Sequence, residues 1–495
     1  MTVELSGGLG NVMFQLAAAY ALSRRYDKDV AVTPHPLLKV FEQHPAEDTA
    51  PKSLVVQEEN PGFDWSQWDD AAGVSGVLFR GYFQSSKYWE TKETVTKYLV
   101  AFRKEYYSVV DRYRSDKPLI GIHIRRGDYV NNPNYHKLPI AYYLGALYKF
   151  FPDFEKDNTL LIFSDDLPWC KIQFQCFDNV VYVDEPPVET MIMMTVCEGL
   201  ILSNSTFSWW GAFLSNARRV VYPTKYFSGD LAHLSTATFW EERWSPFSHN
   251  HKFNFNDVTF VIPVTYDQPA REENLTATVR VLREHFQTNI VIGENNSSRF
   301  SHIDADVIPF NHRHFHRTRM INQMVALIRT KYFVNWDADV FVPAAQIVKT
   351  VNHLRSGVDM VLPYDGTFHN INREHYPAIV ADRDVAVIGE YELVSSMQGS
   401  VGGAIAFRRR SFLNGGGENE RFVSYGPEDK ERWYRFSTLG FKTAKIKGTL
   451  YHLDHKRTPN SSTAHKHFLA NNKEWEKVQG MDKESLTKYI NGNSS

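Results

Sequence analysis

Two short clusters of charged residues stand directly after apolar runs, where strands of a sheet would end. The first, Arg125-Arg126-Gly127-Asp128, follows the run Leu119 to Ile124. Ligands bind at the carboxyl ends of strands in open α/β sheets. A guanidinium presents a planar fork of donors that fits phosphate oxygens, and a glycine lets the backbone approach a ligand closely. The segment therefore predicts a clamp for a diphosphate leaving group, although a surface turn with solvated charges would have the same residues.

The second cluster is Asp337-Ala338-Asp339, which follows the run Tyr332 to Trp336. Side chains alternate along an extended chain, so Asp337 and Asp339 are expected to point to the same side as they leave the sheet. Two carboxylates in this position can hold a divalent cation against a diphosphate. Solvated loop acids show the same pattern, so the prediction of a metal site depends on the rest of the second half.

The elements that must position the first cluster follow from alternating short apolar runs and helical runs. This alternation, between Leu119 and Phe227, is typical of a parallel α/β sheet. Nearer the N-terminus, a glycine-rich turn opens the helical run Val12 to Arg25, which we assign to a partner α/β lobe. The strands expected in the parallel sheet are residues 119–124, 159–163, 180–183, 200–202 and 220–222.

A second α/β pattern begins at Val258, after a polar and aromatic stretch without a regular period. Its expected elements are a strand over 258–264, a helix over 272–285 and a long helix over 318–329 that feeds strand 332–336. The chain has 495 residues, more than one hydrophobic core usually supports. We therefore expect a first domain of residues 1–245, a linker of residues 246–256, and a second domain of residues 257–495 with a C-terminal tail.

The bulk composition excludes several classes of protein. Hydrophobic residues make up 43% of the chain and charged residues 23%, as in an ordinary globular protein. The net charge is −2 and the sequence has no basic stripe, so it does not predict a basic surface that would bind nucleic acid. The three cysteines lack the paired spacing of a zinc site and are read as free thiols. Since no apolar run resembles a signal or a membrane span, we expect a cytoplasmic protein of a bacterium, a virus or a host cell.

Three segments of the first half, in this order, resemble the α-1,2-fucosyltransferases of glycosyltransferase family 11. They are SGGLGNVMFQLAAAYALSRRY, IGIHIRRGDYV and LILSNSTFSWWGAFLS. The resemblance covers about residues 1–245 and implies a GT-B-like double Rossmann unit that transfers L-fucose from GDP-fucose. The chain departs from the usual opening of the family at Val12 and Leu16, which leaves the acceptor open.

The same resemblance implies donor-binding roles by position. His123, Arg125 and Arg126 would bind the GDP part of the donor, and Gly8 and Asn11 would lie near the donor or the acceptor.

A hydroxyl-rich turn containing Ser205 and Thr206 either donates to phosphate or only caps the following helix. Inverting transfer also requires a general base on the acceptor hydroxyl, and Asp128, Asp165 and Asp166 are the candidates.

Segments of the second half resemble the β-1,4-galactosyltransferase family and its relatives of the GT-A fold. They are residues 271–275, 315–322, 402–407, 412–415 and 425–429. The resemblance implies a GT-A-type α/β domain that performs a metal-dependent, inverting transfer of a hexose from a UDP-sugar. UDP-galactose is the leading candidate for this donor. The Trp-rich acceptor segment of the family is replaced here by residues 421–425, which leaves donor and acceptor open.

This second resemblance also assigns roles by position. Arg271, Arg317 and Asp337 would lie at the nucleotide diphosphate. A departing diphosphate needs a cation, and Asp339 would bind Mn²⁺ or Mg²⁺. His455 matches the metal-binding histidine of the family.

On the acceptor side, Asp429 would be the catalytic base that takes the proton of the acceptor hydroxyl. Glu428 and Gly403 would lie at the acceptor sugar. His452 is either a second metal ligand or a surface residue, while His312, His314 and His316 fit a solvated loop as well as a metal site.

Together these features favour a bifunctional glycosyltransferase whose halves add two sugars to an oligosaccharide or glycoconjugate acceptor. Tethering would raise the effective concentration of the intermediate at the second site. Two alternatives remain: one half is active and the other is a glycan-binding or docking module, or the whole protein is lectin-like. The joint presence of Arg125, Arg126, Asp339 and Asp429 favours two active halves.

Overall fold

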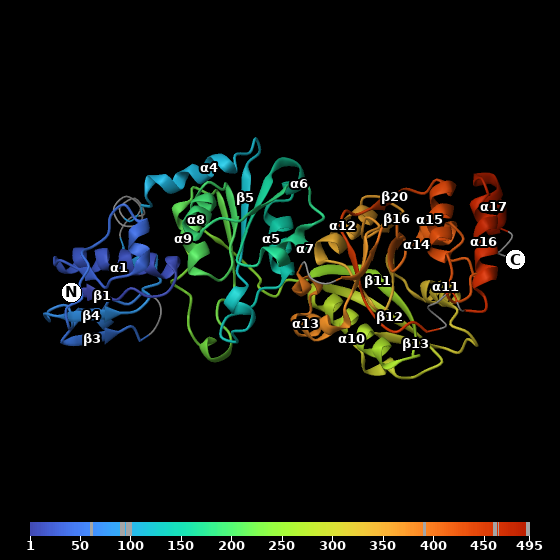
Figure 1. Cartoon of the computed structure of the whole chain (residues 1–495), viewed down its shortest axis with the longest axis horizontal. Coiled ribbons are helices and arrows are strands. Elements are labelled where there is room, and N and C mark those ends of the chain that lie inside the picture. The colour runs from blue at the N-terminus through green and yellow to red at the C-terminus, as the bar shows by residue number, and fades with distance from the viewer. Residues whose placement is uncertain are drawn as a thin grey trace. The chain divides into compact units, whose positions relative to one another are not determined.

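The computed structural model describes residues 1–59, 63–89, 95, 101–389, 393–458, 463 and 465–491. The chain forms two compact units, coloured from blue to green and from green to red in Figure 1, which are considered separately below. Unit 1 consists of Met1–Leu167 and Asp178–His251, and unit 2 of Pro168–Phe177 and Lys252–Ser495. Both are built from α/β sheets, as the sequence predicts, and parallel pairing predominates.

The N-terminal part of unit 1 is a parallel four-stranded sheet in the order β2-β1-β4-β3. Helix α1 (Leu9–Tyr26) follows the first strand and is buried along most of its length. It contains the helical run predicted from the sequence and begins three residues earlier, directly after Gly8. The strands are β1 (Thr2–Val3), β2 (Ala31–Val32), β3 (Leu54–Gln57) and β4 (Val77–Arg80).

The second sheet of unit 1 has six parallel strands in the order β10-β9-β8-β5-β6-β7. The strands are β5 (Leu119–Ile124), β6 (Thr159–Ser164), β7 (Val180–Val183), β8 (Gly199–Ile201), β9 (Arg219–Pro223) and β10 (Ser245–Phe247). The helices around them are α4 (Val109–Arg112), α5 (Ile140–Phe150), α6 (Phe154–Asp157), α8 (Pro187–Thr195) and α9 (Thr206–Leu214), and α2 (Ser66–Asp69) belongs to the first lobe. Strands β5 and β7 have the predicted bounds.

An aromatic core joins the two lobes of unit 1. Phe14 of α1 packs against Trp209 and Trp210 of α9, at ring-centroid distances of 4.6 and 5.1 Å. The two helices cross closely, because a Cβ at Gly10 would lie 2.6 Å from the backbone carbonyl carbon of Thr206. This crossing brings the glycine-rich turn together with the hydroxyl-rich turn, two segments far apart in the sequence.

Unit 2 contains a seven-stranded sheet in the order β13-β12-β11-β14-β19-β16-β20. Strand β19 is antiparallel to both of its neighbours, and the other pairs are parallel. The strands are β11 (Phe253–Thr265), β12 (Phe286–Asn295), β13 (Asp306–Phe310), β14 (Tyr332–Trp336), β16 (Met360–Leu362), β19 (Ala404–Arg408) and β20 (Thr443–Lys445).

Helices α10 (Pro269–His285) and α11 (Arg317–Leu327) match two predicted helices with shifted ends. Helix α10 begins earlier than predicted because Pro269 occupies its first turn, where the missing N–H costs nothing. The remaining helices are α12 (Ala344–Arg355), α13 (Tyr376–Asp382), α14 (Arg409–Asn414), α15 (Glu428–Leu439), α16 (Phe468–Gln479) and α17 (Lys483–Asn491).

A small four-stranded sheet in the order β15-β21-β17-β18 completes unit 2. Its strands are β15 (Val340–Phe341), β17 (Phe368–Ile371), β18 (Leu393–Met397) and β21 (Leu450–Leu453). The pair Asp337 and Asp339 lies between β14 of the large sheet and β15 of the small one. This position places the two carboxylates where the two sheets meet.

The segment Pro168–Phe177, although it comes from the first half of the sequence, belongs to unit 2. It contains most of helix α7 (Leu167–Phe174). Trp169 donates from Nε1 to Asp384 Oδ2 over 3.1 Å, and Gln173 donates to both oxygens of the same carboxylate. The Gln175 side chain accepts from the Thr449 amide.

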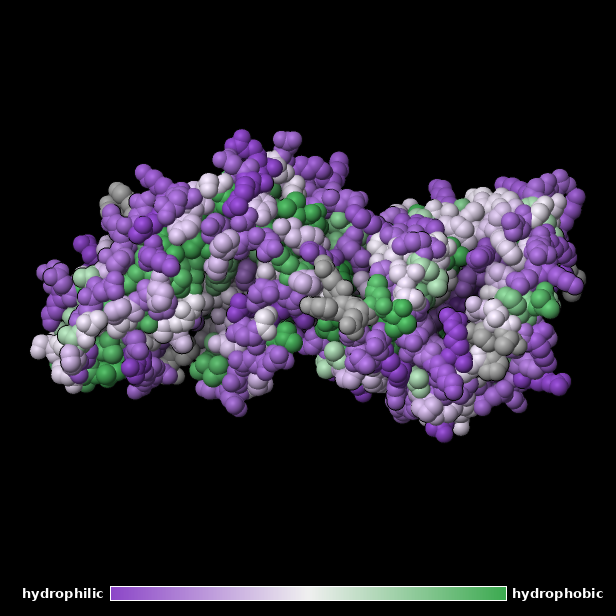
Figure 2. All heavy atoms as spheres, viewed as in Figure 1, coloured by the Kyte–Doolittle hydropathy of each residue, from purple (hydrophilic) through white to green (hydrophobic). Residues whose placement is uncertain are grey.

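Hydrophilic residues cover most of the face of each unit that Figure 2 shows. Among the described residues, no helix combines the length and the apolar character needed to cross a membrane. The three cysteines, Cys170, Cys176 and Cys197, are buried thiols.

Candidate functional sites

Unit 1 contains a cavity of about 870 Å³ at the carboxyl ends of strands from both of its sheets. The four-stranded sheet contributes residues that follow β1, β3 and β4, and the six-stranded sheet contributes residues that follow β5, β6 and β7. Of the residues predicted from the sequence, those that line the cavity are Gly8, Asn11, His123, Arg125, Asp128, Asp165, Ser205 and Thr206.

The two arginines of the predicted clamp have different surroundings. Arg125 lines the cavity, binds Asp128 over 2.5 Å and Asp165 over 2.8 Å, and lies over the ring of Tyr129. The Arg126 side chain is only 7% exposed, and its Nε binds Asp166 over 2.9 Å. Arg126 is not among the described lining residues, so the cavity presents one arginine of the pair.

His123 enters the cavity as a neutral imidazole. Its Nδ1 lies 2.8 Å from Ser203 Oγ, and its ring stacks on Phe207. Burial, reinforced by the charge of Arg125, lowers the pKa of His123 to about 3. The ring can therefore form hydrogen bonds with a ligand but adds no charge near neutral pH.

The beginnings of two helices meet at this cavity. Ser205 caps α9 by accepting from the Phe207 amide over 3.3 Å, and Thr206 is the first residue of that helix. Gly8 and Asn11 stand at the beginning of α1, where the Asn11 side chain accepts from Gln84. Helix N-termini present free amides and a positive dipole end, which favour an anion.

Several lining residues have no counterpart in the sequence motifs, and Glu58 is one of them. It follows the short strand β3 directly, so the rule that ligands bind at strand ends could have found it. Tyr129 and Tyr135 form a stacked pair with centroids 4.3 Å apart. The other lining residues of this kind include Glu4, Arg80, Tyr82, Gln84, Glu185, Tyr226 and Phe227.

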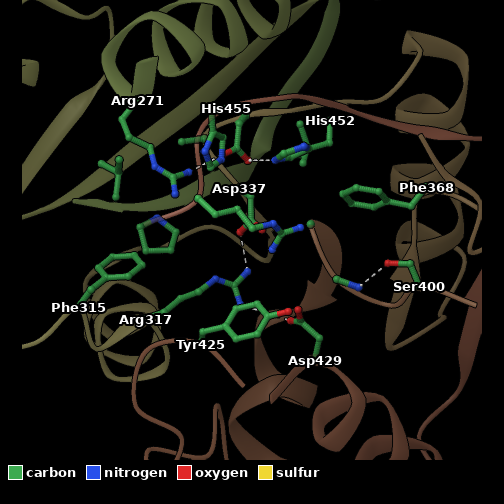
Figure 3. A pocket seen from close by; sticks show the side chains of 18 of the residues that line it. Arg271, Phe315, Arg317, Asp337, Phe368, Ser400, Tyr425, Asp429, His452 and His455 are labelled. Atoms are coloured by element: carbon green, nitrogen blue, oxygen red, sulfur yellow. Dashed lines mark hydrogen bonds and ion pairs between the residues drawn. The ribbon is translucent and has the colours of Figure 1, made fainter. Parts of the chain in front are cut away.

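Unit 2 contains a second, smaller cavity of about 320 Å³ (Figure 3). Its walls come from the ends of β11 and β14, from the small sheet, and from the beginning of α15. All the residues predicted for the second half line it: Arg271, Arg317, Asp337, Asp339, Gly403, Glu428, Asp429, His452 and His455.

Asp339, His452 and His455 form a group whose ligand atoms lie within 4.8 Å of one another. The Asp339 side chain is 6% exposed, and its oxygens lie 3.1 Å from His455 Nε2 and 3.6 Å from His452 Nε2. Among the described residues this is the one group of three such side chains arranged closely enough to hold a metal ion. Sequence reasoning left the role of His452 open, and the structure places it beside His455.

The partner of His452 fixes which of its nitrogens is available. His452 Nδ1 lies 2.8 Å from Asn370 Oδ1, an acceptor, so Nδ1 has the proton and Nε2 has a lone pair. His455 Nδ1 lies between an acceptor, the Lys456 carbonyl at 3.0 Å, and a donor, Gln268 Nε2 at 3.3 Å. A lone pair facing a carboxylate oxygen is stable when a cation or a proton lies between them, so this donor set fits a metal ion.

Two arginines neutralise the carboxylates of the cavity. Arg271 binds Asp339 over 2.5 Å, and Arg317 binds Asp337 over 2.6 Å. Arg317 also lies 3.3 Å from Asp429 and 3.6 Å from Glu428. Thus Asp337 and Asp339 both line the cavity, but they pair with different groups. Figure 3 shows Arg317 beside Asp337.

The acid pair Glu428 and Asp429 begins helix α15. Burial, followed by the charge of Asp429, raises the pKa of Glu428 to about 8. Burial acts in the same direction on Asp429, but Arg317 and Arg432 outweigh it and lower the pKa of Asp429. The pair therefore holds one proton near neutral pH, on Glu428, and leaves Asp429 ionised.

The absence of a side chain at Gly402 leaves room for the Asp429 carboxylate. A Cβ at Gly402 would lie 2.4 Å from Asp429 Oδ2, so a larger residue would displace the carboxylate. The neighbouring Gly403 has a φ of +81°, which L side chains rarely adopt.

The three alternate histidines of the second half are not part of the metal-binding group among the described residues. His316 caps α11 by accepting from the Arg319 amide. His314 lies near His465 and His467.

Comparison with known proteins identifies the class of the first half. A family model described as Glycosyl transferase family 11 matches residues 77–242. This region is therefore that of a glycosyltransferase, similar to the fucosyltransferases of family 11.

Two curated relatives from Escherichia coli are similar over nearly their whole length. The O-antigen biosynthesis glycosyltransferase WbnK is 26% identical over 297 residues, which cover 48% of this chain and 98% of the relative. The alpha-1,2-colitosyltransferase is 26% identical over 265 residues, which cover 44% of this chain and 88% of the relative. A galactoside alpha-(1,2)-fucosyltransferase 2 from Sus scrofa is 26% identical over 109 residues, 20% of this chain and 32% of that protein.

Two solved structures overlap with parts of the chain at low scores. The catalytic domain of Drosophila beta1,4-galactosyltransferase 7 aligns with a TM-score of 0.23 and 14% identity, covering 38% of this chain and 64% of that one. NodZ alpha-1,6-fucosyltransferase aligns with a TM-score of 0.30 and 11% identity, covering 44% of this chain and 93% of that one. Superpositions this weak carry no argument, and the proposals below rest on the site residues.

Proposed function

We propose that this protein is a bifunctional glycosyltransferase. Unit 1, as a GT-B-like double Rossmann unit, transfers L-fucose from GDP-fucose to a glycan hydroxyl, in α-1,2 linkage and with inversion. Unit 2, as a GT-A-type domain, performs a metal-dependent inverting transfer of a hexose from a UDP-sugar, with galactose as the first donor to test.

The observation that supports the first activity is the anion-binding end of the unit 1 cavity. Arg125 and the N-termini of α1 and α9 line one cavity, within a unit whose residues 77–242 match the family 11 model. Positive groups in this arrangement stabilise the charge that develops on a departing diphosphate. The stacked rings of Tyr129 and Tyr135 offer an aromatic surface for the base or the sugar.

The observation that supports the second activity is the pairing of a metal-binding group with an ionised carboxylate in one cavity. Asp339, His452 and His455 would hold the cation, which when bound would neutralise the diphosphate of the donor. One carboxylate with two imidazoles favours Mn²⁺, because Mg²⁺ prefers ligands that are all oxygen.

Asp429 is the base of this reaction in our proposal. It takes the proton from the acceptor hydroxyl as that oxygen bonds to the anomeric carbon, while the bond to the diphosphate breaks. Glu428, which holds its proton near neutral pH, can donate a hydrogen bond to an acceptor oxygen. Arg317 binds Asp429 and keeps it ionised.

A donor panel tests both activities. GDP-fucose, GDP-colitose, UDP-galactose and UDP-glucose would be assayed for transfer to lactose and for hydrolysis, with Mn²⁺ or with a chelator. We expect GDP-sugar turnover to survive chelation and fail in Arg125→Ala, and UDP-sugar turnover to require Mn²⁺ and fail in Asp429→Asn. A donor class that is neither transferred nor hydrolysed would refute the activity proposed for that unit and leave it as a binding module.

A further inference from the structure

The unit 1 reaction needs a base, and most carboxylates of its cavity are already bound to cations. Asp128 and Asp165 both bind Arg125. Asp166, the third acid suggested by the sequence, binds Arg126. A guanidinium stabilises the ionised form of a carboxylate, so each of these acids is a weaker base than a carboxylate without such a partner, as is Asp429 of unit 2.

Two further carboxylates that line the cavity, Glu4 and Glu185, are also paired. Glu4 forms an ion pair with Arg80, and Glu185 binds both Arg112 and the Tyr113 hydroxyl. Among the described residues that line the cavity, Glu58 is the one carboxylate without a cationic partner.

Glu58 is held firmly by one of its two oxygens. Its Oε2 accepts from the backbone amides of Tyr82 over 2.6 Å and Phe83 over 3.4 Å. Its Oε1 is buried and receives no hydrogen bond from the described residues. A buried polar atom without a partner is costly, and a ligand that donates a hydrogen bond would remove this cost.

The backbone opposite Glu58 is shaped to accommodate the side chain. A Cβ at Gly81 would lie 2.6 Å from Glu58 Cβ and 2.7 Å from its Oε2. Gly81 follows β4 as Glu58 follows β3, and these neighbouring strands are paired in register. The carboxylate is therefore fixed at the edge of the four-stranded sheet, while Arg125 comes from the end of β5 in the other sheet.

We propose that Glu58 is the general base of the unit 1 transfer and acts on the acceptor hydroxyl. The inference rests on the proposed sugar transfer from a GDP-linked donor. In this step the acceptor oxygen bonds to the anomeric carbon, the bond from that carbon to the diphosphate breaks, and GDP leaves. Glu58 Oε1 takes the hydroxyl proton, and GDP leaves with the electrons of the broken bond, so the step is balanced.

Two properties of Glu58 agree with this role. Burial raises the pKa of Glu58, and the amides of Tyr82 and Phe83 offset only part of this effect, so the carboxylate is a stronger base than one in water. Glu58 follows a strand of the four-stranded sheet, whereas Arg125 and helix α9 follow strands of the six-stranded sheet. The acceptor and the leaving group can therefore contact different walls of one cavity, as an inverting displacement requires.

The test compares wild type, Glu58→Gln, Glu58→Ala and the control Glu59→Gln, which changes the exposed neighbouring acid. Transfer of fucose from GDP-fucose to lactose gives kcat, and calorimetry gives the Kd for GDP. We expect Glu58→Gln to lower kcat by about 10²- to 10⁴-fold with the Kd for GDP within about twofold of wild type. We expect formate, a small external base, to restore part of the rate of Glu58→Ala and to leave wild type and Glu59→Gln unchanged.

The outcomes separate the inference from the proposed function. If the wild type turns over GDP-fucose and Glu58→Gln keeps its rate, the role of Glu58 is refuted while the function stands. If Glu58→Gln loses GDP affinity in proportion to its rate, or formate restores nothing to Glu58→Ala, Glu58 has a structural role and the inference fails. If the wild type neither transfers nor hydrolyses GDP-fucose, the proposed function fails and the inference fails with it.

Discussion

The orientation of two imidazole rings decides whether unit 2 can bind a metal. His452 and His455 turn Nε2 toward Asp339, and the Nδ1 of His452 donates to Asn370 Oδ1. This oxygen would lie outside the coordination sphere, yet it selects the tautomer of His452. Groups of this kind commonly affect metal affinity by about 10- to 100-fold.

Replacing Asn370 by alanine therefore tests the metal site without removing a ligand. We expect Asn370→Ala to weaken Mn²⁺ binding by about 10- to 100-fold, because the His452 ring loses the partner that fixes its tautomer. Isothermal titration with Mn²⁺ measures this effect, and His302→Ala, at an exposed histidine of the same unit, is the control. Unchanged Mn²⁺ affinity in Asn370→Ala, or equal loss in the control, would contradict the assignment.

The acid pair of unit 2 predicts a dependence on pH. Glu428 has a pKa raised to about 8, so it is protonated below that pH and becomes a second anion beside Asp429 above it. We expect kcat/KM for the UDP-sugar to fall as pH rises through about 8. Glu428→Gln, which cannot ionise, should remove this alkaline decline, as pH–rate profiles of the two proteins would show.

The same raised pKa affects stability, and the sign follows from linkage. The folded protein holds the Glu428 proton more tightly than the unfolded chain does, so protonated Glu428 contributes fully to the free energy of unfolding at acidic pH. This contribution is lost as pH rises from the ordinary carboxyl range through about 8. The Tm of the wild type should therefore fall relative to that of Glu428→Gln over this range, and parallel Tm curves would contradict the assignment.

At the scale of elements, the crossing of α1 and α9 assembles the anion-binding end of unit 1. The two helices approach at Gly10, where an added Cβ would lie 2.6 Å from the Thr206 backbone. Gly10→Ala should favour the helix by about 1 kcal/mol in propensity, yet it must push the two N-termini apart. We expect a net loss of about 1–3 kcal/mol of stability and at least tenfold weaker GDP binding.

Denaturant unfolding and GDP titration measure these two effects. Gly73→Ala is the matched control, because a Cβ there would meet no atom within 4 Å. If Gly10→Ala binds GDP as tightly as the wild type, the helix crossing does not shape the site.

The sequence predicted those elements whose signal is local. Strands β5, β7 and β14 have the predicted bounds, because each is a mostly apolar run that is followed directly by charged residues. Strand β11 begins at Phe253, earlier than predicted, because its first residues pair with β12 and a bulge before Thr259 breaks the alternation. Strand β10 lies where the sequence shows no period, since three residues are too few to establish one.

Among the site residues too, those set by their own segment of sequence could be predicted, and those set by contacts with distant segments could not. Motif positions placed Arg125 and Asp339 at cavities, because Arg125 follows β5 directly and Asp339 lies in the short link between β14 and β15. The burial of Arg126 against Asp166 depends on a side chain from the neighbouring strand end, which no motif contains. The position of Glu58 after a strand end is local information, but the hydrogen bond and the space that fix its carboxylate come from Tyr82 and Gly81, at the end of another strand.

At the scale of the whole molecule, each cavity is built within a single unit. All described lining residues of the larger cavity belong to unit 1, and those of the smaller cavity belong to unit 2. No described residue lines both cavities. The two proposed activities can therefore be assayed separately in the intact chain through their different donors.

The units are nevertheless interleaved in sequence, which predicts the behaviour of fragments. Unit 2 includes Pro168–Phe177, where Trp169 and Gln173 bind the buried carboxylate of Asp384. A fragment of residues 252–495 lacks this segment and both of its donors. Because the fragment loses these hydrogen bonds and the burial that the segment provides, we expect it to unfold at a lower temperature than unit 2 does in the whole chain.

Calorimetry of the full chain and of the 252–495 fragment measures this difference. A fragment with Asp384→Asn provides the control, because both donors are absent there and the substitution should change its Tm little. In the full chain the same substitution should lower the Tm, since Trp169 and Gln173 then donate to a weaker, neutral acceptor. A clear loss in the full chain beside little change in the fragment would show that the Pro168–Phe177 segment stabilises unit 2. Equal Tm values for the fragment and for unit 2 in the whole chain would show that it does not.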